Sequence, residues 1–273
     1  MINIKRIRRL AKKYNAKIRG VTQKNVLHIS EKARFGNLLY FYLHCYLDNK
    51  KNKHTFILYT NTMKYWLNYF PSHTKFIVYR DEFKLNIDNL DWIDSYYQNF
   101  NKDFTQEELN EFIEKFLIVN SSFSDLKTLD KTVINIRRGD FYNENSDTVS
   151  SFDQISYVNK VILNYPLLFQ SNIEIVSDDI NWCIENLKFP DNIITDNLKY
   201  NMNSSPYEDF YTICSAKNLI LTNSTFSYWG GYVCKYLDDN NMVIAPDFGS
   251  QLYKDKIAIQ LANNWEIIDV INE

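Results

Sequence analysis

Short hydrophobic runs alternate with longer amphipathic stretches along most of this chain. Runs rich in Val, Ile, Phe and Tyr are typical of buried strands, whereas apolar residues spaced three and four apart are typical of helices. Strands are predicted at Val26–Ile29, Thr55–Tyr59, Lys75–Tyr79, Thr132–Arg137, Ile173–Val176, Ile193–Thr195, Asn218–Leu221 and Met242–Ala245. Helices are predicted near 36–48, 62–69, 106–118, 152–164, 179–187, 206–217 and 226–237, the third with a capping box from Thr105 and Glu108. This alternation indicates an α/β protein with parallel sheets.

Two polar stretches interrupt the pattern. Asp81–Gln106 is acidic and loop-like, and Asn120–Lys131 is polar, so a domain boundary is predicted near 120–131. We expect a helix over residues 1–20, an N-terminal α/β domain at 21–125 and a C-terminal α/β domain at 126–273. In open α/β sheets, ligands bind beyond the carboxyl ends of the strands. Candidate chemistry is therefore sought directly after each predicted strand.

The composition is that of a protein with a substantial core. The chain is 45% hydrophobic and 16% aromatic, which excludes a disordered, collagen-like or small disulfide-stapled chain. No apolar run approaches the roughly 18 residues of a membrane span, and no signal-peptide pattern follows the first charges. We expect a cytoplasmic protein whose four cysteines are buried free thiols, because no C-x-x-C pair occurs among Cys45, Cys183, Cys214 and Cys234.

Positive charge is concentrated at the start of the chain. Residues 1–34 hold eleven Lys or Arg and one acid, although the whole chain has a net charge of −2. Two interpretations of the basic amphipathic helix stay open: it docks on the protein with a solvated basic face, or it makes peripheral contact with the anionic inner face of a membrane. Nucleic acid is not an expected partner, because the rest of the chain is acidic. The apolar face of this helix would be formed by Ile4, Ile7, Ala11, Tyr14 and Ile18.

Asn135-Ile136-Arg137-Arg138-Gly139-Asp140 ends one predicted strand with two guanidinium groups, a glycine and a carboxylate. Alternation along a strand points Arg137 and Arg138 to opposite sides, so one can face a ligand while the other anchors the loop. An arginine at this place offers a planar fork to a diphosphate. The alternative is a pair of surface arginines in a turn.

Two further polar segments follow predicted strands. A helix is predicted to begin at Ser177. Either Ser177 and Asp178 only cap this helix, or Asp178 and Asp179 form an acceptor pair for a base or ribose. The adjacent acids do not form a D-x-D motif, and no metal site is predicted. Thr222–Phe226 opens another helix, where hydroxyls and backbone N–H groups form a phosphate cradle or only an N-cap. The common dinucleotide, ATPase, zinc-protease and hydrolase motifs do not occur in the sequence.

Five motifs occur in a fixed order along the chain. They are Arg34-Phe35-Gly36-Asn37, the residues 135–140 above, Ser-Asp-Asp-Ile-Asn-Trp-Cys at 177–183, Glu-Asp-Phe-Tyr at 208–211 and Asn-Ser-Thr-Phe-Ser-Tyr-Trp-Gly at 223–230. In this order they resemble glycosyltransferase family 11, the α-1,2-fucosyltransferases, here of bacterial type. The resemblance runs from about residue 26 to Asn264-Trp265-Glu266-Ile267. It implies a GT-B-like fold of two Rossmann-like domains with parallel sheets and a cleft between them.

The resemblance also implies the substrates and the site. The donor is GDP-β-L-fucose, no metal or other cofactor is required, and inversion gives an α-fucoside. Residues 21–125 form the acceptor side and residues 126–273 bind the donor nucleotide. Arg137 binds the β-phosphate, Asp140 holds the end of that loop, residues 178–179 lie near the guanosine, residues 224–226 line the pyrophosphate and residues 36–37 cover the sugar. The catalytic residues are then Arg137 and Asp140, and the donor-binding residues are Gly36, Asn37, Arg137, Asp178, Asp179, Ser224, Thr225 and Phe226.

The base that accepts the acceptor proton is left open among three carboxylates. Asp140 ranks first by its motif, ahead of Glu144 and Asp147. Two positions depart from the family pattern: Asn135 stands where it usually has His, and Leu38 where it has Gln. An amide can hydrogen-bond but cannot titrate, so a proton-transfer role at position 135 is in doubt.

The expected function is transfer of L-fucose to a hydroxyl, galactose O2, of an oligosaccharide or lipid-linked glycan acceptor in surface polysaccharide synthesis. Two alternatives remain: a glycosyltransferase of the same fold that uses another nucleotide sugar, and a non-catalytic relative that binds a glycan or nucleotide.

Overall fold

The computed structural model describes residues 20–22, 25–80, 96–142, 151–170, 172–191, 193, 195–251 and 255–271. Residues 1–19 of the predicted basic helix lie outside these ranges, as do the candidate bases Glu144 and Asp147. The chain divides into two compact units, Met1–Ser124 and Asp125–Glu273. Each unit is described here by itself.

The first unit contains a parallel sheet in the order β1-β2-β3. The long helix α2 connects β1 to β2, and 11 of its 16 residues are buried, so it forms the centre of this unit's core. Helix α4 begins at the predicted capping box: Thr105 Oγ1 accepts the Glu108 N–H at 3.2 Å, and Glu108 Oε2 accepts the Thr105 N–H at 3.0 Å. The elements are β1 (Val26–Leu27), α2 (Phe35–Lys50), β2 (Phe56–Leu58), α3 (Met63–Trp66), η2 (Pro71–Phe76), β3 (Ile77–Val78), α4 (Gln106–Ile113) and η4 (Glu114–Ile118).

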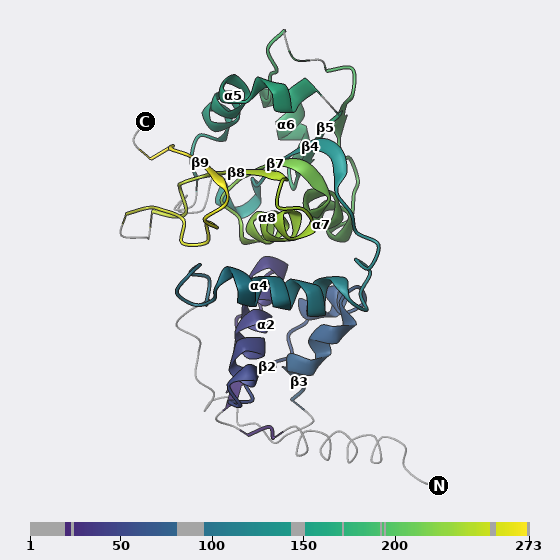
Figure 1. Ribbon diagram of the computed structural model, residues 1–273, viewed down its shortest axis with the longest axis vertical. Coiled ribbons are helices and arrows are strands. Elements are labelled where there is room, and N and C mark those ends of the chain that lie inside the picture. The colour runs from purple at the N-terminus through teal and green to yellow at the C-terminus, as the bar shows by residue number, and fades with distance from the viewer. Residues whose placement is uncertain are drawn as a thin grey trace. The chain divides into compact units, whose positions relative to one another are not determined.

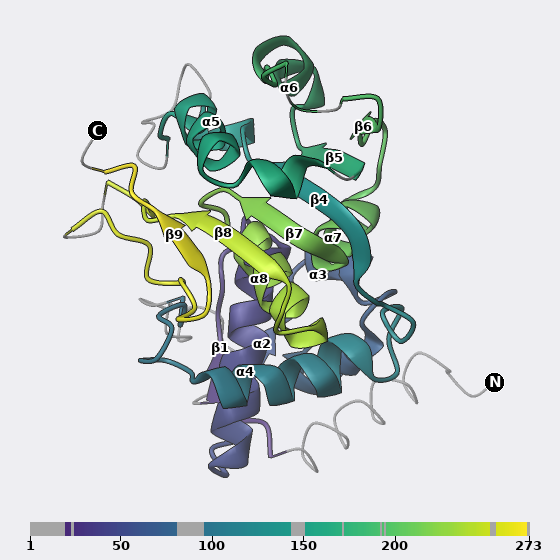
Figure 2. The same ribbon diagram turned by 45° about the horizontal axis from the view of Figure 1, so that its top comes forward.

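The second unit contains a six-stranded sheet in the order β6-β5-β4-β7-β8-β9, with every pairing parallel. Helices α5 and α6 cover one face of this sheet, and α7 and α8 cover the other (Figures 1 and 2). The elements are β4 (Leu129–Ile136), η5 (Gly139–Phe141), α5 (Gln154–Asn164), η6 (Pro166–Gln170), β5 (Asn172–Ser177), α6 (Ile180–Asn186), β6 (Leu198–Tyr200), α7 (Pro206–Cys214), β7 (Ala216–Leu221), α8 (Thr225–Leu237), β8 (Met242–Pro246) and β9 (Glu266–Ile268).

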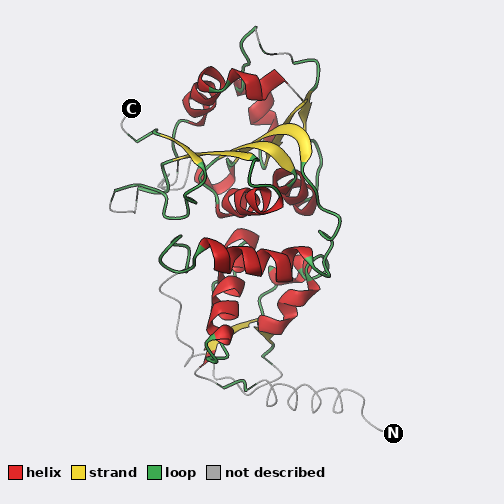
Figure 3. Cartoon of the chain, viewed as in Figure 1, coloured by secondary structure: helices red, strands yellow, loops and turns green. Residues whose placement is uncertain are grey.

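The α/β fold with parallel sheets is confirmed (Figure 3). The order of the second sheet places β4 beside both β5 and β7, so the chain winds outward in one direction from β4 to β6 and in the other from β7 to β9. Between β4 and β7 the winding reverses, and such a switch point is where doubly wound sheets bind ligands. Ile136 pairs with Ser177 and Asn135 with Leu221, so the carboxyl ends of the three strands are level.

The structure corrects several expectations about the elements. The predicted helix 206–217 ends at Cys214, and Lys75 and Phe76 of a predicted strand lie in η2. The predicted strand Ile193–Thr195 is wrong: the Ile193 N–H instead closes a turn on the Pro190 carbonyl at 2.9 Å, and the edge strand is Leu198–Tyr200. The predicted helix 106–118 is α-helical only to Ile113, after which it widens into a π-helical turn. Strand β9 was not predicted.

All four cysteines are free and buried, as predicted. Among the described residues, none of the helices has the length and apolar character needed to cross a bilayer.

Candidate functional site

Residues that follow β4, β5 and β7 are hydrogen-bonded to one another at the carboxyl edge of the second sheet. The backbone N–H of Arg137 donates to Thr222 Oγ1 at 3.0 Å, which links the end of β4 to the end of β7. The backbone N–H of Arg138 donates to Asp178 Oδ1 at 2.8 Å, which links β4 to β5. Three segments far apart in the sequence thus form one polar edge.

The Arg137 guanidinium lies between two carboxylates. Its Nη1 is 2.5 Å from Asp178 Oδ2, and its Nη2 is 2.5 Å from Asp140 Oδ1. The arginine side chain is 18% exposed, compared with 29% for Asp178 and 57% for Asp140. The guanidinium is therefore oriented by a half-buried carboxylate on one side and a largely exposed one on the other.

Arg138 has a different environment from Arg137. Its guanidinium lies 3.7 Å from the ring centroid of Tyr142 and 3.8 Å from that of Trp182, so it is held between two aromatic faces. The Tyr142 hydroxyl in turn donates to the Phe152 carbonyl at 2.6 Å, and burial raises the pKa of this hydroxyl. The expectation that one arginine of the pair anchors the loop is confirmed, and Arg138 is that residue.

Asp179, not Ser177 or Asp178, caps helix α6. Asp179 Oδ1 accepts the Trp182 N–H at 3.2 Å, and Ser177 Oγ accepts the Asp179 N–H at 3.0 Å. The capping interpretation of Ser177 and Asp178 is wrong because the Asp178 carboxylate turns toward the loop after β4 instead.

Helix α8 begins beside this edge without a side-chain cap. Ser224 is its N-cap residue, but its side chain makes no capping hydrogen bond. The unbonded N–H groups of a first helical turn, together with the helix dipole, favour an anion. The first turn of α8 is fixed through Asn135, whose Oδ1 accepts a hydrogen bond from Ser227 Oγ and whose Nδ2 donates to the Val176 carbonyl at 3.1 Å.

The sequence of the chain matches the family model of Glycosyl transferase family 11 over residues 23–268, nearly its whole length. The chain belongs to this family. Its members are glycosyltransferases, which move a sugar from a nucleotide-sugar donor to a glycan acceptor. A comparison with curated proteins gives no match.

The donor-binding residues implied by the family lie in both units. The second unit brings Arg137, Asp140 and Asp178 into direct contact, with Asp179 at the start of α6 and Ser224, Thr225 and Phe226 at the start of α8. In the first unit, Gly36 is buried in the first turn of α2 and Asn37 Oδ1 accepts a hydrogen bond from Gln98 Nε2 at 3.0 Å. Leu38, the departure from the family's Gln, is fully buried in that unit's core.

Sequence reasoning did not single out Gln154 at this candidate site, and it gave no individual role to Thr222 or Asp209. Thr222 and Gln154 both hydrogen-bond the backbone of Arg137, the latter from Nε2 to its carbonyl at 2.8 Å. Asp209 accepts hydrogen bonds from Ser204 Oγ and from Asn201 Nδ2, the latter at 3.1 Å. Burial raises the pKa of Asp209, and the nearby charge of Asp178 adds to the effect. The Glu-Asp-Phe-Tyr motif at 208–211 was the available signal for Asp209.

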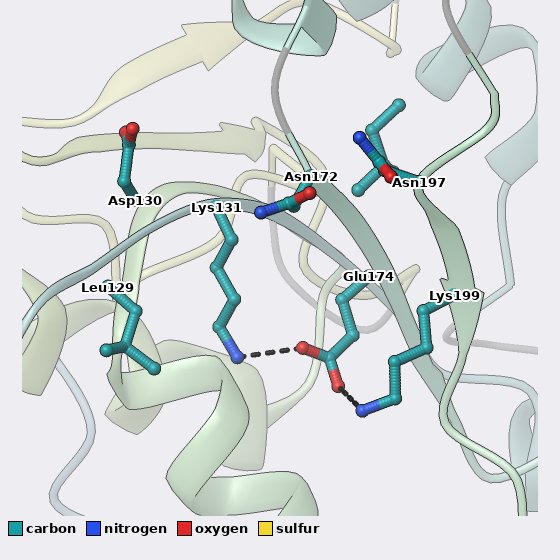
Figure 4. A pocket seen from close by; sticks show the side chains of 8 residues that line it. Leu129, Asp130, Lys131, Asn172, Glu174, Asn197 and Lys199 are labelled. Carbon is teal, nitrogen blue, oxygen red and sulfur yellow. Dashed lines mark hydrogen bonds and ion pairs between the residues drawn. The ribbon is translucent and has the colours of Figure 1, made fainter.

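A pocket of about 430 Å³ lies at the opposite, amino edge of β4, β5 and β6 (Figure 4). Glu174 points into it and pairs with Lys131 at 2.8 Å and Lys199 at 2.9 Å. Burial raises the pKa of Glu174, but the hydrogen bonds from the two lysines outweigh it and hold the pKa below its ordinary value. These charges satisfy one another, so we interpret the triad as structural. Within the described ranges, no group of three or more His, Cys, Asp or Glu side chains could hold a metal ion.

Proposed function

We propose that the protein transfers L-fucose from GDP-β-L-fucose to a hydroxyl, galactose O2, of a glycan acceptor, with inversion and without a metal ion. Family membership supports glycosyl transfer. The observation that carries the proposal is Arg137 at the end of the central strand β4, bonded through its backbone to Thr222, two residues before the uncapped start of α8. A guanidinium and a helix N-terminus are the two groups that stabilise a departing diphosphate without a metal.

The mechanism follows from the charge that develops on the leaving group. Breaking the glycosyl–phosphate bond leaves negative charge on GDP and an oxocarbenium-like sugar. Arg137 and the first N–H groups of α8 would stabilise the diphosphate, and losing one such preorganised donor typically costs about 10²–10³ in rate. A single displacement with inversion needs a carboxylate near the acceptor hydroxyl. Asp140 ranks first for this role by its place in the motif at 135–140, with Glu144 and Asp147 as alternatives.

The test is an assay with GDP-fucose and an oligosaccharide that ends in a β-galactoside, with and without chelator. We expect product in both conditions, and Arg137→Ala should reduce turnover about 10²–10³-fold. Lys217→Ala is the control, because it removes an exposed cation that pairs with Asp130 at the amino ends of β7 and β4 rather than at the carboxyl edge. Loss of product in chelator would contradict metal independence, and near-normal turnover of Arg137→Ala would remove its role.

A second candidate is transfer from another nucleotide sugar by the same fold. The observation that favours it is that Asn135 and Leu38 depart from the family pattern. The Asn135 side chain is hydrogen-bonded to Ser227 and Val176, and Leu38 is buried. A thermal-shift panel of GDP-fucose, GDP-mannose, UDP-galactose and GDP separates the two candidates. Strongest stabilisation by the uridine nucleotide would overturn the guanosine assignment.

Donor hydrolysis and membrane contact are tested in two separate experiments. A non-catalytic relative would not hydrolyse the donor when no acceptor is present, whereas a competent site usually transfers some sugar to water. Peripheral membrane contact through residues 1–20 stays a prediction; it requires that deleting them changes membrane fractionation.

A further inference from the structure

The main chain of Arg137 is held on both sides by buried side chains. Arg137 is the first residue after β4, and the last residues of that strand with a partner are Asn135, opposite β7, and Ile136, opposite β5. The Arg137 backbone N–H donates to Thr222 Oγ1 at 3.0 Å, and the Arg137 carbonyl accepts a hydrogen bond from Gln154 Nε2 at 2.8 Å. Two side chains therefore continue the support that the neighbouring strands give to β4.

The hydroxyl of Thr222 takes the place of a strand partner for the Arg137 N–H. Thr222 comes directly after β7 and is fully buried. A buried hydroxyl is costly unless it is hydrogen-bonded, and so is a backbone N–H that lies beyond the end of its ladder. The bond between Thr222 and Arg137 satisfies both groups and ties the end of β4 to the end of β7.

The amide of Gln154 is buried for the sake of the Arg137 carbonyl. Gln154 is the first residue of α5 and is 2% exposed. Glutamine is seldom buried to this degree unless its polar atoms are bonded. Here Nε2 donates to the Arg137 carbonyl, while Oε1 has no hydrogen-bond partner among the described residues. The bond to Arg137 is therefore the contact that accounts for this buried amide.

Helix α5 is itself fixed to the same edge of the sheet. One turn after Gln154, the buried hydroxyl of Tyr157 donates to the carbonyl of Leu221 at 3.0 Å. Leu221 is the last residue of β7 and precedes Thr222. Thr222 and Gln154 thus belong to elements that are bonded to each other, and side chains on such rigid elements can hold a third residue in one place.

We propose that Thr222 and Gln154 are positioning residues of the transfer reaction, which fix the main chain of Arg137 on both sides so that its guanidinium meets the diphosphate in one place. This rests on the proposed function, since it requires a nucleoside diphosphate at Arg137. Asp178, 2.5 Å from Nη1, orients the guanidinium end of the side chain, and the two hydrogen bonds fix its backbone end. The placement matters because a displacement of about 1 Å at a reacting group can cost about 10²-fold in rate.

The test uses variants that remove one hydrogen bond and little else. Thr222→Val keeps the branched shape but loses the acceptor, and Thr222→Ser keeps the hydroxyl. GDP binding is measured by isothermal titration calorimetry. We expect Thr222→Val to raise the Kd for GDP about tenfold and Thr222→Ser to restore binding close to that of wild type.

Thr132→Val is the matched control. Thr132 is also fully buried and lies in the amino half of β4, where its hydroxyl donates to the Leu168 carbonyl and accepts from Asn218 Nδ2 at 3.1 Å. Losing these bonds should lower the stability of the second unit to urea and leave the Kd for GDP unchanged. A rise in Kd equal to that of Thr222→Val would show a general effect of buried hydroxyls and overturn the positioning role.

A double-variant cycle tests whether Thr222 acts through Arg137. Turnover is measured at low concentrations of radiolabelled GDP-fucose, which detects rates far below that of wild type. Once the guanidinium is removed its position no longer matters, so Thr222→Val should lower kcat/KM by less than about twofold in the Arg137→Ala background. A purely structural role would give the same loss in both backgrounds, and that result would overturn the proposal.

The remaining outcomes separate this proposal from the proposed function. Wild-type protein that binds no GDP would overturn both, whereas wild type that binds GDP and Thr222→Val that binds it equally well would overturn the positioning role alone. If Thr222→Val fails to fold by circular dichroism, Gln154→Met decides. It keeps an unbranched side chain on α5, loses the donor to the Arg137 carbonyl and should raise the Kd for GDP about three- to tenfold; an unchanged Kd would refute the role of the clamp.

Discussion

His73 should make the stability of the first unit depend on pH. Its imidazole is fully buried and stacks on Tyr42, with ring centroids 4.5 Å apart, and on Phe112 at 6.2 Å. Neither Nδ1 nor Nε2 has a hydrogen-bond partner among the described residues. Burial lowers the pKa of His73 from 6.5 to about 3, because the interior does not solvate the imidazolium. The folded protein therefore holds this side chain neutral at pH values where the unfolded chain protonates it.

The sign and size of the effect follow from proton linkage. Between pH 6.5 and about 3 the unfolded state binds a proton that the folded state does not, so the free energy of unfolding rises with pH. The contribution of the neutral His73 to the free energy of unfolding is fully present above pH 6.5. It falls by about 1.4 kcal/mol for each pH unit below that value, a loss of ~2 kcal/mol at pH 5. His73→Phe removes this slope and two unpartnered nitrogens while keeping a ring. At neutral pH His73→Phe should raise the free energy of unfolding by about 1–3 kcal/mol, less the cost of fitting a larger ring into the core.

The assay is urea unfolding of the first unit at pH 5, 6, 7 and 8, read by hydrogen exchange in peptides from α2. His54→Asn is the control: His54 is exposed with a φ of +53°, a conformation that asparagine tolerates. This control should keep the wild-type pH dependence. His73→Phe should remove only the share due to the buried imidazole, because burial also lowers the pKa of His28 and His44 in the same unit. If wild type and His73→Phe lose stability in parallel from pH 7 to pH 5, the reasoning about the buried imidazole is wrong.

Two further substitutions test the second unit. Gly139→Ala places a Cβ against Asp178 Oδ2 and should weaken GDP binding about tenfold by calorimetry. Gly20→Ala is the control, because Gly20 also has a positive φ but faces open space, and it should leave GDP binding unchanged. Equal effects of the two substitutions would show that the close contact between Gly139 and Asp178 does not matter for binding. Glu174→Ala leaves Lys131, whose side chain is 13% exposed, without its carboxylate partner. The free energy of unfolding of this unit, measured in urea, should fall by about 3 kcal/mol. A loss below about 1 kcal/mol would show that water solvates the lysine.

Hydrophobic patterning predicted the central strands of the second sheet because they are buried on both faces. Strand β4 carries the β-branched residues Val133, Ile134 and Ile136, which favour a buried strand. Edge strands lack this signal. Strand β6 is Leu198-Lys199-Tyr200, none of it buried, and β9 has only Ile268 buried, so neither segment differs in sequence from a polar loop. The pairing with β5 and β8 decides their structure, and that pairing is not local.

The candidate site was predictable in its residues but not in their contacts. The motif at 135–140 identified Arg137 and Asp140, which are three residues apart. The pairing of Arg137 with Asp178 depends on a register between β4 and β5 that joins residues 41 positions apart, and no local pattern sets it. The sequence predicted the cap of α6 at Ser177 and Asp178 rather than at Asp179, because Ser and Asp are all good N-cap residues and only the position of the first helical turn selects among them.

Asn135 departs from the family pattern but makes two hydrogen bonds that a histidine at this position could also make. Its side chain donates from Nδ2 to the Val176 carbonyl and accepts from Ser227 at Oδ1, so it joins β4 to both β5 and α8. A neutral imidazole also has one donor nitrogen and one acceptor nitrogen. The histidine usual at this position in glycosyltransferase family 11 could therefore make the same two bonds, and asparagine gives up only the ability to titrate. The bonds that Asn135 makes here fix the first turn of α8 against β4, and the amide that makes them cannot titrate.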